Sequence, residues 1–250
     1  MPEHHIERVV PTGHIFILFE LDNIPRHTFG HDLKPNATYT KVWVSGMHQN
    51  YLNISAHKDS EMLVVQVKTF GAFPFFKIPI DSFTESIKPA ADFFGDSIFE
   101  VREKILASMP VAEKFNVVED WLAKQLDESL APAQSLEDML LAFQTNPFSK
   151  HSELIKNYPN TQKHLIHQFK KFCGLSPKAL HKIIRFNNIL QIIHQREEIV
   201  WTDIAYETGF SDQSHFIKEF QDFSGFNPSK YIKKGYNESI PNFFPIDPGG

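Results

Sequence analysis

The sequence of 250 residues has one cysteine, Cys173, and no long apolar run. A single cysteine excludes an internal disulfide framework and a zinc site made of several cysteine thiolates, and it is typical of a reducing compartment. The longest apolar run near the start, residues 15–19, is far shorter than the roughly 20 residues that a membrane-spanning helix needs. No signal peptide is visible. We therefore expect a soluble cytoplasmic protein that has no membrane partner.

The sequence also lacks the common patterns of catalytic chemistry. We find no nucleophile constellation, no glycine-rich loop that would cradle a phosphate, and no paired-carboxylate signature. These absences favour a protein that is not an enzyme and that needs no cofactor.

Positive charge is scarce overall but concentrated in one region. The formal net charge is −5, from 25 Lys and Arg against 30 Asp and Glu. Residues 147–236 hold 13 of the basic and 8 of the acidic residues, a net charge of +5, which leaves −10 for the rest. This asymmetry predicts two parts with different partners, of which the basic part suits a polyanion.

The first part of the sequence is typical of β-structure. Short β-branched and aromatic runs, separated by turn residues, lie at 14–21, 40–44, 62–67 and 72–76. Several such strands predict a barrel or a sandwich, in which Pro74 and Pro79 make the last runs edge or irregular strands. The phenylalanines of this part are expected either to form its core or to line an apolar ligand pocket. They are Phe70, Phe73, Phe75, Phe76, Phe93 and Phe94.

Helical patterns begin near residue 97. Ser97 and Glu100 have the spacing of a capping box, and amphipathic helices follow at 117–126 and 135–143. The helix of Trp121 is expected either to pack on the barrel or to form a dimer seam. Residues 146–234 are expected to be helical, and 236–250, with three prolines and two glycines, to be a tail.

The helical part repeats itself at a separation of 51 residues. Leu165 and Phe169 match Phe216 and Phe220, and each pair lies on one face of a helix. A glycine follows each helix where a C-terminal cap favours positive φ, and a proline three residues later opens the next segment. These residues are Gly174, Gly225, Pro177 and Pro228.

The residues ahead of the second copy have the pattern of a helix-turn-helix. Ile204 and Ala205 give a short helix a small packing surface, and Gly209 permits a tight turn. Ser211 is expected to cap the helix that follows. In this motif the second helix enters the major groove of DNA.

Residues 147–234 resemble the DNA-binding domain of AraC/XylS-type bacterial transcription regulators. The resemblance lies in FKKFCGLSPKALHKIIRF and IAYETGFSDQSHFIKEFQDFSGFNPSKYI, which include Phe210 and Tyr231. The family carries two helix-turn-helix units joined by a long helix, here expected at 177–195, in which Arg185 takes the family's structural arginine position. More weakly, 62–105 resembles the cupin-like β-domain that some members carry.

The resemblance implies a multidomain α+β protein that acts as a sequence-specific regulator of transcription. We expect a β-rich cupin-like barrel or sandwich for sensing or dimerisation at 1–96, a helical linker at 97–145, the all-α DNA-binding domain at 146–235 and the tail at 236–250. The expected partner is double-stranded DNA, read in two adjacent major-groove segments. A small-molecule effector in the N-terminal domain and a homodimer are left open.

The same resemblance implies which side chains contact DNA. The first recognition helix is expected at 161–172, and its outward residues are Lys163, His164, His167, Lys170 and Lys171. The candidates of the second unit are Gln213, Ser214, His215 and Lys218. Lysine suits phosphate as a point charge, whereas glutamine can read adenine with two hydrogen bonds.

The sequence departs from the family at several positions. Ile155 and Pro159 stand in the first turn where a small residue and glycine are common, and His167 stands where a base-reading arginine is common. Gln221 and Asp222 replace the usual basic residues, and Asp222 would repel phosphate if it faced DNA. Two alternatives stay open: an interaction protein that has lost DNA binding, and a cupin-like metalloenzyme with an appended helical domain.

The histidines of the first domain invite a metal interpretation. They are His14, His27, His31, His48 and His57. Cupin-type folds often hold a metal with a close His-x-His pair and a downstream glutamate, which this sequence lacks. We therefore expect no metal site.

Overall fold

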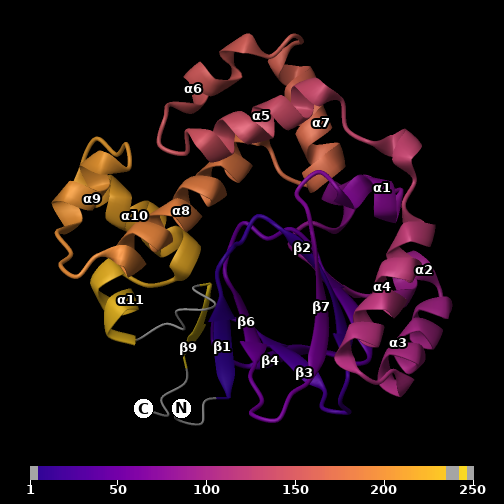
Figure 1. Cartoon of the computed structure of the whole chain (residues 1–250). Coiled ribbons are helices and arrows are strands. Elements are labelled where there is room, and N and C mark those ends of the chain that lie inside the picture. Colours follow the sequence, from indigo (N-terminus) through magenta and orange to yellow (C-terminus); the bar gives the residue numbers. More distant parts are fainter. Residues whose placement is uncertain (1–4, 235–241, 247–250) are drawn as a thin grey trace.

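The N-terminal part of the chain is built from two antiparallel sheets in the computed structural model, which describes residues 5–234 and 242–246. One sheet has the strand order β4-β3-β6-β1-β9 and the other β7-β2-β5-β8. The two sheets face each other in Figure 1, with β1 and β6 on one side and β2 and β7 on the other. The strands are β1 (Ile6–Val9), β2 (Ile15–Glu20), β3 (Arg26–Phe29), β4 (Pro35–Tyr39), β5 (Val42–Ser45), β6 (Leu52–Ser55), β7 (Met62–Val67), β8 (Ile87–Pro89) and β9 (Phe243–Pro245).

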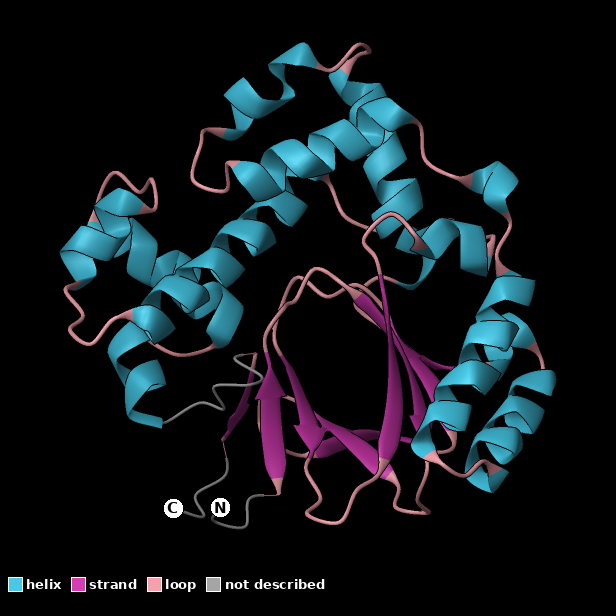
Figure 2. Ribbon diagram, in the orientation of Figure 1, coloured by secondary structure: helices cyan, strands magenta, loops and turns pink. Residues whose placement is uncertain are grey.

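Helices arch around these sheets, with the last helices beside β1 and β9 (Figure 2). The α-helices are α1 (Ala72–Phe76), α2 (Ala91–Phe94), α3 (Ser97–Ala107), α4 (Val111–Gln125), α5 (Gln134–Thr145), α6 (His151–Leu154), α7 (Gln162–Cys173), α8 (Pro177–Gln195), α9 (Trp201–Glu207), α10 (Gln213–Ser224) and α11 (Pro228–Lys234). Short 3-10 helices are η1 (Ile80–Phe83), η2 (Glu128–Leu130) and η3 (Ile155–Asn157). A strand-rich part followed by a helical part is the α+β architecture that the sequence predicts.

The alternation of side chains along β2 explains how the sheets are covered. Ile17 and Phe19 are fully buried, and Phe19 meets Trp121 of α4 edge to face. Phe16 and Leu18 point to the opposite face and line a cavity between the sheets. Trp121 therefore packs on the sheet, which is one of the two alternatives that the sequence left open for its helix.

Two local predictions in the N-terminal half are wrong. Residues 72–76 form helix α1 and not a strand, because Pro74 has no N–H for a strand ladder but fits the first turn of a helix. Ser97 does not cap α3: Asp96 precedes the helix, and the Ser97 hydroxyl donates to the carbonyl of Phe94.

Strand β9 lies in the segment that the sequence predicts to be a tail. It pairs antiparallel with β1, so that Arg8 stands opposite Phe244. The amide of Val10 donates to the carbonyl of Asn242 at 3.0 Å, and Ile246 donates to Ile6 at 3.2 Å. The tail prediction is therefore wrong for these residues; 236–241 and 247–250 lie outside the described residues.

Candidate nucleic-acid interface

Helix α7 is capped at both ends by the residues that the sequence indicates. The hydroxyl of Thr161 accepts a hydrogen bond from the amide of His164 at 3.2 Å. Gly174 ends the helix in the left-handed conformation, with φ of 82°. Leu165 and Phe169 are buried, whereas Lys163, His164, His167 and Lys170 are exposed. The helix thus has one face for the core and a basic face for solvent.

The imidazole of His164 is held from the side by a residue that precedes the helix. The hydroxyl of Tyr158 lies 2.9 Å from Nδ1 of His164, and the two rings are stacked. The amide nitrogen of Gln168 lies 3.5 Å from Nε2, too far to fix the ring. Sequence reasoning missed Tyr158 and Gln168, although Gln168 stands one helical turn after His164 and could have been paired with it.

Helix α10 has the same form with a different cap. Asp212, and not Ser211, is its N-cap: the carboxylate of Asp212 accepts from the amide of His215 at 2.8 Å, and the Ser211 hydroxyl donates to Asp212. The prediction that Ser211 caps the helix is wrong by one residue, because aspartate can fill this position equally well. Gly225 ends the helix with φ of 69°.

The first turn of α10 carries the exposed candidates. Ser214, His215 and Lys218 are exposed, and Gln213 is partly exposed. Phe216 and Phe220 are buried on the other face. All four candidates therefore lie on the solvent side or at its margin.

The turn ahead of α10 requires its glycine. Gly209 has φ of 80°, and a Cβ on this residue would lie 2.6 Å from the carbonyl oxygen of Phe148. Ile204 and Ala205 of α9 are fully buried, and Phe210 packs on Phe216. The short helix, glycine turn and second helix that the sequence predicts are all present.

A buried ion cluster joins α8 to α10. Glu219 is 6% exposed and pairs with Arg185 and with Lys182, whose Nζ lies 2.7 Å from the carboxylate. Burial opposes ionisation of Glu219, but these two cations lower its pKa overall. The Arg185 guanidinium also lies 4.2 Å from the ring centroid of Phe210. Arg185 is therefore a structural residue, as the family resemblance implies.

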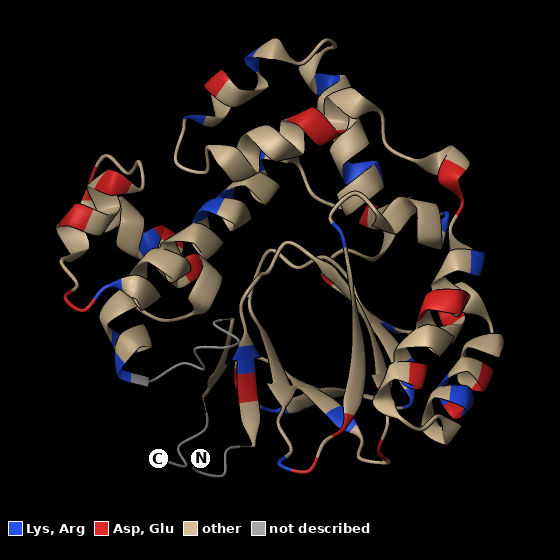
Figure 3. Ribbon diagram, viewed as in Figure 1, with Lys and Arg blue, Asp and Glu red and all other residues tan. Residues whose placement is uncertain are grey.

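Charge is distributed unequally over the two helices (Figure 3). Helix α7 has three lysines and no acidic residue, whereas α10 has Lys218, Glu219 and Asp222. Asp222 and Gln221 line a crevice against His31, His48 and Tyr51 of the N-terminal part. Asp222 thus lies on the side of α10 that faces the N-terminal sheets. The exposed first turn of α10, which carries the candidate DNA contacts, is a different part of the helix.

The N-terminal part contacts α7 through aromatic side chains. Phe70 packs edge to face on Phe169 with ring centroids 5.1 Å apart, and Phe73 packs on Phe172 at 5.1 Å. The ammonium of Lys171 lies 4.3 Å from the ring centroid of Phe73, which places this candidate against the N-terminal part. Phe70 and Phe73 are thus core residues at the junction of the two halves.

The N-terminal part contacts α10 through Arg8. Its Nη1 donates to the carbonyl of Ser224 at 3.2 Å, at the C-terminal end of the helix. Its guanidinium lies 3.8 Å from the ring centroid of Tyr51 and 4.6 Å from that of Phe226. Sequence reasoning missed Arg8, because no local pattern links residues 216 positions apart.

A cavity of about 1130 Å³ lies between the two sheets. Much of its wall is apolar and includes Phe16, Leu18, Leu52, Ile54 and Val64. Among the described residues that line it, none is one of the six phenylalanines named above. Those phenylalanines therefore do not line this cavity.

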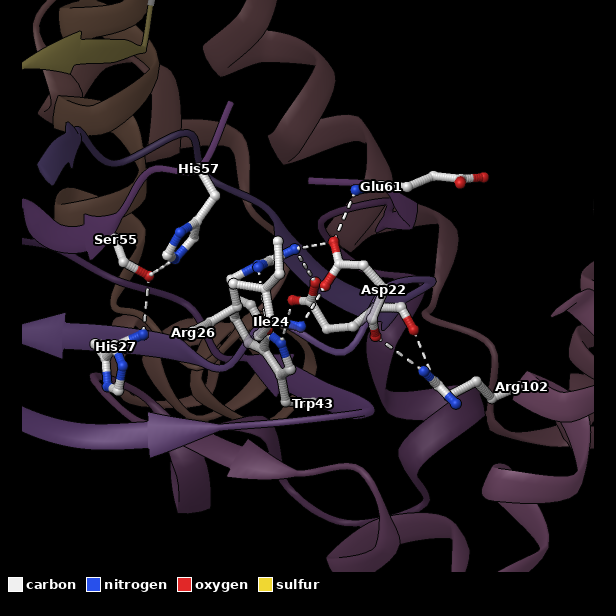
Figure 4. Close-up of polar contacts among 10 residues, drawn as sticks. Asp22, Ile24, Arg26, His27, Trp43, Ser55, His57, Glu61 and Arg102 are labelled. Atoms are coloured by element: carbon white, nitrogen blue, oxygen red, sulfur yellow. Dashed lines mark hydrogen bonds and ion pairs between the residues drawn. The ribbon is translucent and has the colours of Figure 1, made fainter. Parts of the chain in front are cut away.

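One end of the cavity holds a polar cluster (Figure 4). Arg26 lies 2.7 Å from the carboxylate of Glu20 and 2.6 Å from that of Asp22. Trp43 donates to Glu20 at 2.8 Å, and Arg102 donates to its backbone carbonyl at 2.7 Å. Burial nevertheless raises the pKa of Glu20, against the opposing effect of Trp43 and Arg26. The charge of Arg26 is thus compensated inside the protein.

The histidines of this part surround the cavity without forming a metal centre. His14, His27, His48 and His57 line the cavity. Burial lowers the pKa of His14 and of His57, so both are largely neutral at pH 7. Within residues 5–234 and 242–246, no group of three or more His, Cys, Asp or Glu could hold a metal ion.

Comparison with known families agrees with this geometry. Residues 160–234 match the model of a helix-turn-helix domain, and residues 1–89 match that of a domain of unknown function (DUF6597). The C-terminal part of this chain is an AraC-type helix-turn-helix domain. The matched residues of this domain begin just before the Thr161 cap and run to the end of α11.

The similarity of the whole chain to solved structures is weaker than these family matches. ToxT from Vibrio cholerae has a TM-score of 0.48 and 10% identity, covering 93% of this chain and 95% of that chain. ToxT from Vibrio cholerae O395 has a TM-score of 0.48 and 12% identity, and the match covers 92% of this chain and 96% of that chain. The structure of the same protein bound to (E)-4-(8-methylnaphthalen-1-yl)but-3-enoic acid has a TM-score of 0.47 and 12% identity. That match covers 93% of this chain and 96% of that chain. Likenesses at these scores do not transfer function.

No curated protein sequence matches this chain. Among the helices that the structure describes, none is both long and apolar enough to cross a membrane.

Proposed function

We propose that this chain regulates transcription by reading DNA with two helix-turn-helix units, α7 and α10 being their recognition helices. One observation carries the proposal: α7 and α10 have equivalent caps, α7 directly precedes the long helix α8, and α10 packs on α8 through Glu219 and Phe220. Two capped helices joined in this way are what two units that enter successive major-groove segments, roughly 34 Å apart on one face of DNA, require.

The exposed side chains divide the work between the two units. Lys163 and Lys170 of α7 suit phosphates and give affinity without sequence preference, whereas His167, at the family's base-reading position, is the candidate of this unit for a base edge. Gln213, Ser214 and His215 lie in the first turn of α10, and the N-terminal residues of a recognition helix are those that reach base edges. Lys218 adds a phosphate contact in the next turn.

The N-terminal part is proposed to act as the regulatory domain, and its cavity to be the effector site. The cavity is large enough for a drug-sized molecule. An effector can change DNA binding only if it binds two arrangements of the protein unequally. The contacts of Phe70, Phe73 and Arg8 with the helix-turn-helix domain supply an arrangement that an effector could favour or disfavour.

The test is selection of binding sites from fragmented genomic DNA by the full chain, at low and at moderate salt. We expect one enriched motif with two elements a helical turn apart. The double variant Gln213→Ala, His215→Ala should lose the preference in one element. The matched control, Lys104→Ala, removes an exposed charge on α3 and should select the same motif as the wild type.

Two outcomes would contradict the proposal. Enrichment of a single element would show that only one unit reads bases. Binding that enriches no motif and disappears as salt rises would reduce the interaction to charge attraction alone.

A further inference from the structure

Strand β9 presents its two aromatic side chains to different parts of the molecule. Successive side chains of a strand point to opposite faces. Phe243 lines the cavity between the sheets. Phe244 is 1% exposed and packs on Tyr231 of α11 and on Phe226, with ring centroids 5.2 and 5.7 Å apart. The three residues of β9 therefore link the wall of the cavity to the core of the second unit.

A second link runs from the same wall to the joining helix α8. The side-chain amide of Asn242, which lines the cavity, donates to Oδ1 of Asn187 at 2.7 Å. The amide of Asn187 donates to the carbonyl of Pro11 at 3.0 Å, and Pro11 also lines the cavity. The wall of the cavity is thus built jointly from β1, the residues after β1 and the segment that follows the helix-turn-helix domain.

The polar groups of the cavity indicate the chemistry of its ligand. Arg26 is compensated by two carboxylates, and so its charge is already neutralised. Among the described residues that line the cavity, Nε of Arg26, Nδ1 of His14 and Nε2 of His48 are buried without a hydrogen-bond partner. The Nε group of Arg26 is a donor and needs an acceptor rather than a second anion. The rest of the wall offers mainly hydrocarbon surface.

We propose that the cavity takes an uncharged, mainly apolar molecule that carries a hydrogen-bond acceptor, and that β9 forms one of its walls and couples its occupancy to the second unit. The coupling rests on the regulatory function proposed above. A ligand that touches Phe243 only while β9 is paired stabilises the paired arrangement, and with it the contacts of Phe244 with α11.

The ligand class is tested with two naphthalene dyes of similar size. Prodan is neutral and carries a ketone, whereas anilinonaphthalene sulfonate is an anion. In a fluorescence titration of the full chain, we expect prodan to bind at least tenfold more tightly than the sulfonate. Equal or tighter binding of the sulfonate would overturn the assignment of an uncharged ligand.

The wall is tested with Phe243→Ala and with Val64→Ala, a matched control on β7 at another part of the cavity. Both side chains are partly exposed, so both variants should fold. We expect each variant to weaken prodan binding about tenfold, equivalent to about 1.4 kcal/mol. Binding by Phe243→Ala equal to that of the wild type would remove β9 from the wall.

The coupling is tested by amide hydrogen exchange in the absence of DNA. Prodan should slow exchange of Val10, Ile246 and Tyr231 in the wild type and in Val64→Ala once each is saturated. It should not slow exchange of these amides in saturated Phe243→Ala. Equal protection in both variants would show that occupancy and strand pairing are independent.

These measurements separate the inference from the proposed function. If the chain selects no DNA motif but the dye and exchange results are as expected, the site stands and the regulatory role fails. If the chain reads DNA but prodan neither binds nor slows exchange, the site fails while DNA reading stands. A change in operator affinity on saturation with prodan would support both.

Discussion

The two helical units of this protein share a backbone plan and differ in chemistry. Helices α7 and α10 each have an N-cap side chain that accepts a hydrogen bond from the amide three residues later, and both end at a glycine in the left-handed conformation. Helix α7, however, has no acidic residue, whereas α10 contains a buried carboxylate held by α8. The comparison shows that the caps and the spacing of apolar residues are what the two units share. The charged and polar residues on their solvent faces differ.

The two units are also attached to the N-terminal part by different contacts. The first unit is held by aromatic contacts between Phe70, Phe73 and the buried face of α7. The second is held by a cation, Arg8, at the end of α10, and by strand pairing of β9. Each attachment nevertheless includes a cation on an aromatic ring, Lys171 on Phe73 in the first and Arg8 on Phe226 in the second. The two attachments therefore differ in strand pairing, which the second has and the first lacks.

The largest expected effect breaks the apolar core of either unit. Phe169→Ala and Phe220→Ala each remove a fully buried ring and should lower the free energy of unfolding by about 3–5 kcal/mol. Because Phe169 also contacts Phe70, its loss should release the first unit from the N-terminal part as well. Denaturant unfolding measures the loss, and a cost below about 1 kcal/mol for Phe169→Ala would contradict the packing described.

The next effect is confined to the second unit. Arg185→Met leaves the buried carboxylate of Glu219 with Lys182 alone, and should cost about 3 kcal/mol, at the low end for a broken buried pair. The double variant Arg185→Met, Glu219→Met should recover much of this loss. Thermal unfolding of both variants checks the prediction, which fails if the double variant is the less stable of the two.

Lowering the pH should destabilise the two units unequally. The loss of stability should be similar in size to that expected for Arg185→Met. Burial, with His151 and Arg185 nearby, lowers the pKa of His181 to about 4, and its ring stacks on Phe143. Because the folded pKa lies below the unfolded one, this contribution is complete above pH 6.5 and is lost as pH falls toward 4. The loss should approach about 3 kcal/mol. Glu219, whose pKa is also lowered, should weaken the second unit only below about pH 4.5.

The variant His181→Phe isolates the contribution of this histidine. It retains a ring against Phe143 but has no proton to gain. Unfolding measured from pH 7 to 4 should fall less steeply in the variant than in the wild type. Parallel curves would exclude His181 as the source of the acid sensitivity.

A smaller effect sharpens the division of base reading. Gln213→Ala should relax the preference at one base pair and cost about 1–3 kcal/mol on the preferred site. It should change binding to unrelated sequences little. Quantitative binding to a set of single-base variants of the selected site measures this, and a uniform loss over all of them would identify Gln213 as a phosphate contact.

The smallest effect belongs to the first unit. Lys163→Ala should weaken binding across all sequences and reduce the slope of affinity against salt by about one contact. Because Lys163 is exposed, the substitution should change the free energy of unfolding by less than about 0.5 kcal/mol. Titrations at several salt concentrations check the slope, and an unchanged slope would remove Lys163 from the phosphate contacts.

The helical half was predictable because its signals are local. The joining helix is expected at 177–195 from the family resemblance and is found at Pro177–Gln195, with Pro177 at its start as the sequence predicts. Gly174, Gly209 and Gly225 all have positive φ where the spacing of the sequence required it. The exposed residues of both recognition helices remain predictions as DNA contacts.

The N-terminal half was less predictable because its strands are short and their pairing is long-range. Strands β1, β3, β4 and β6 have four or five residues each, several of them polar, and were not recognised. Arg26 and Asn53 are polar residues that are buried by partners elsewhere in the chain, which no local pattern indicates. The contact of Arg8 with Ser224 depends on the whole fold and has no local signature.

The pairing of β1 with β9 also has a consequence for biosynthesis. Residues near the start of the sequence are made early, but Arg8 cannot meet its partner Phe244 until the ribosome has released that segment. The first helical unit, which ends far ahead of β9, can fold before this happens, so the nascent chain passes through a stage with an unpaired edge at β1. Such an edge invites pairing with another chain, and rapid capture of β9 would protect the newly made protein from aggregation.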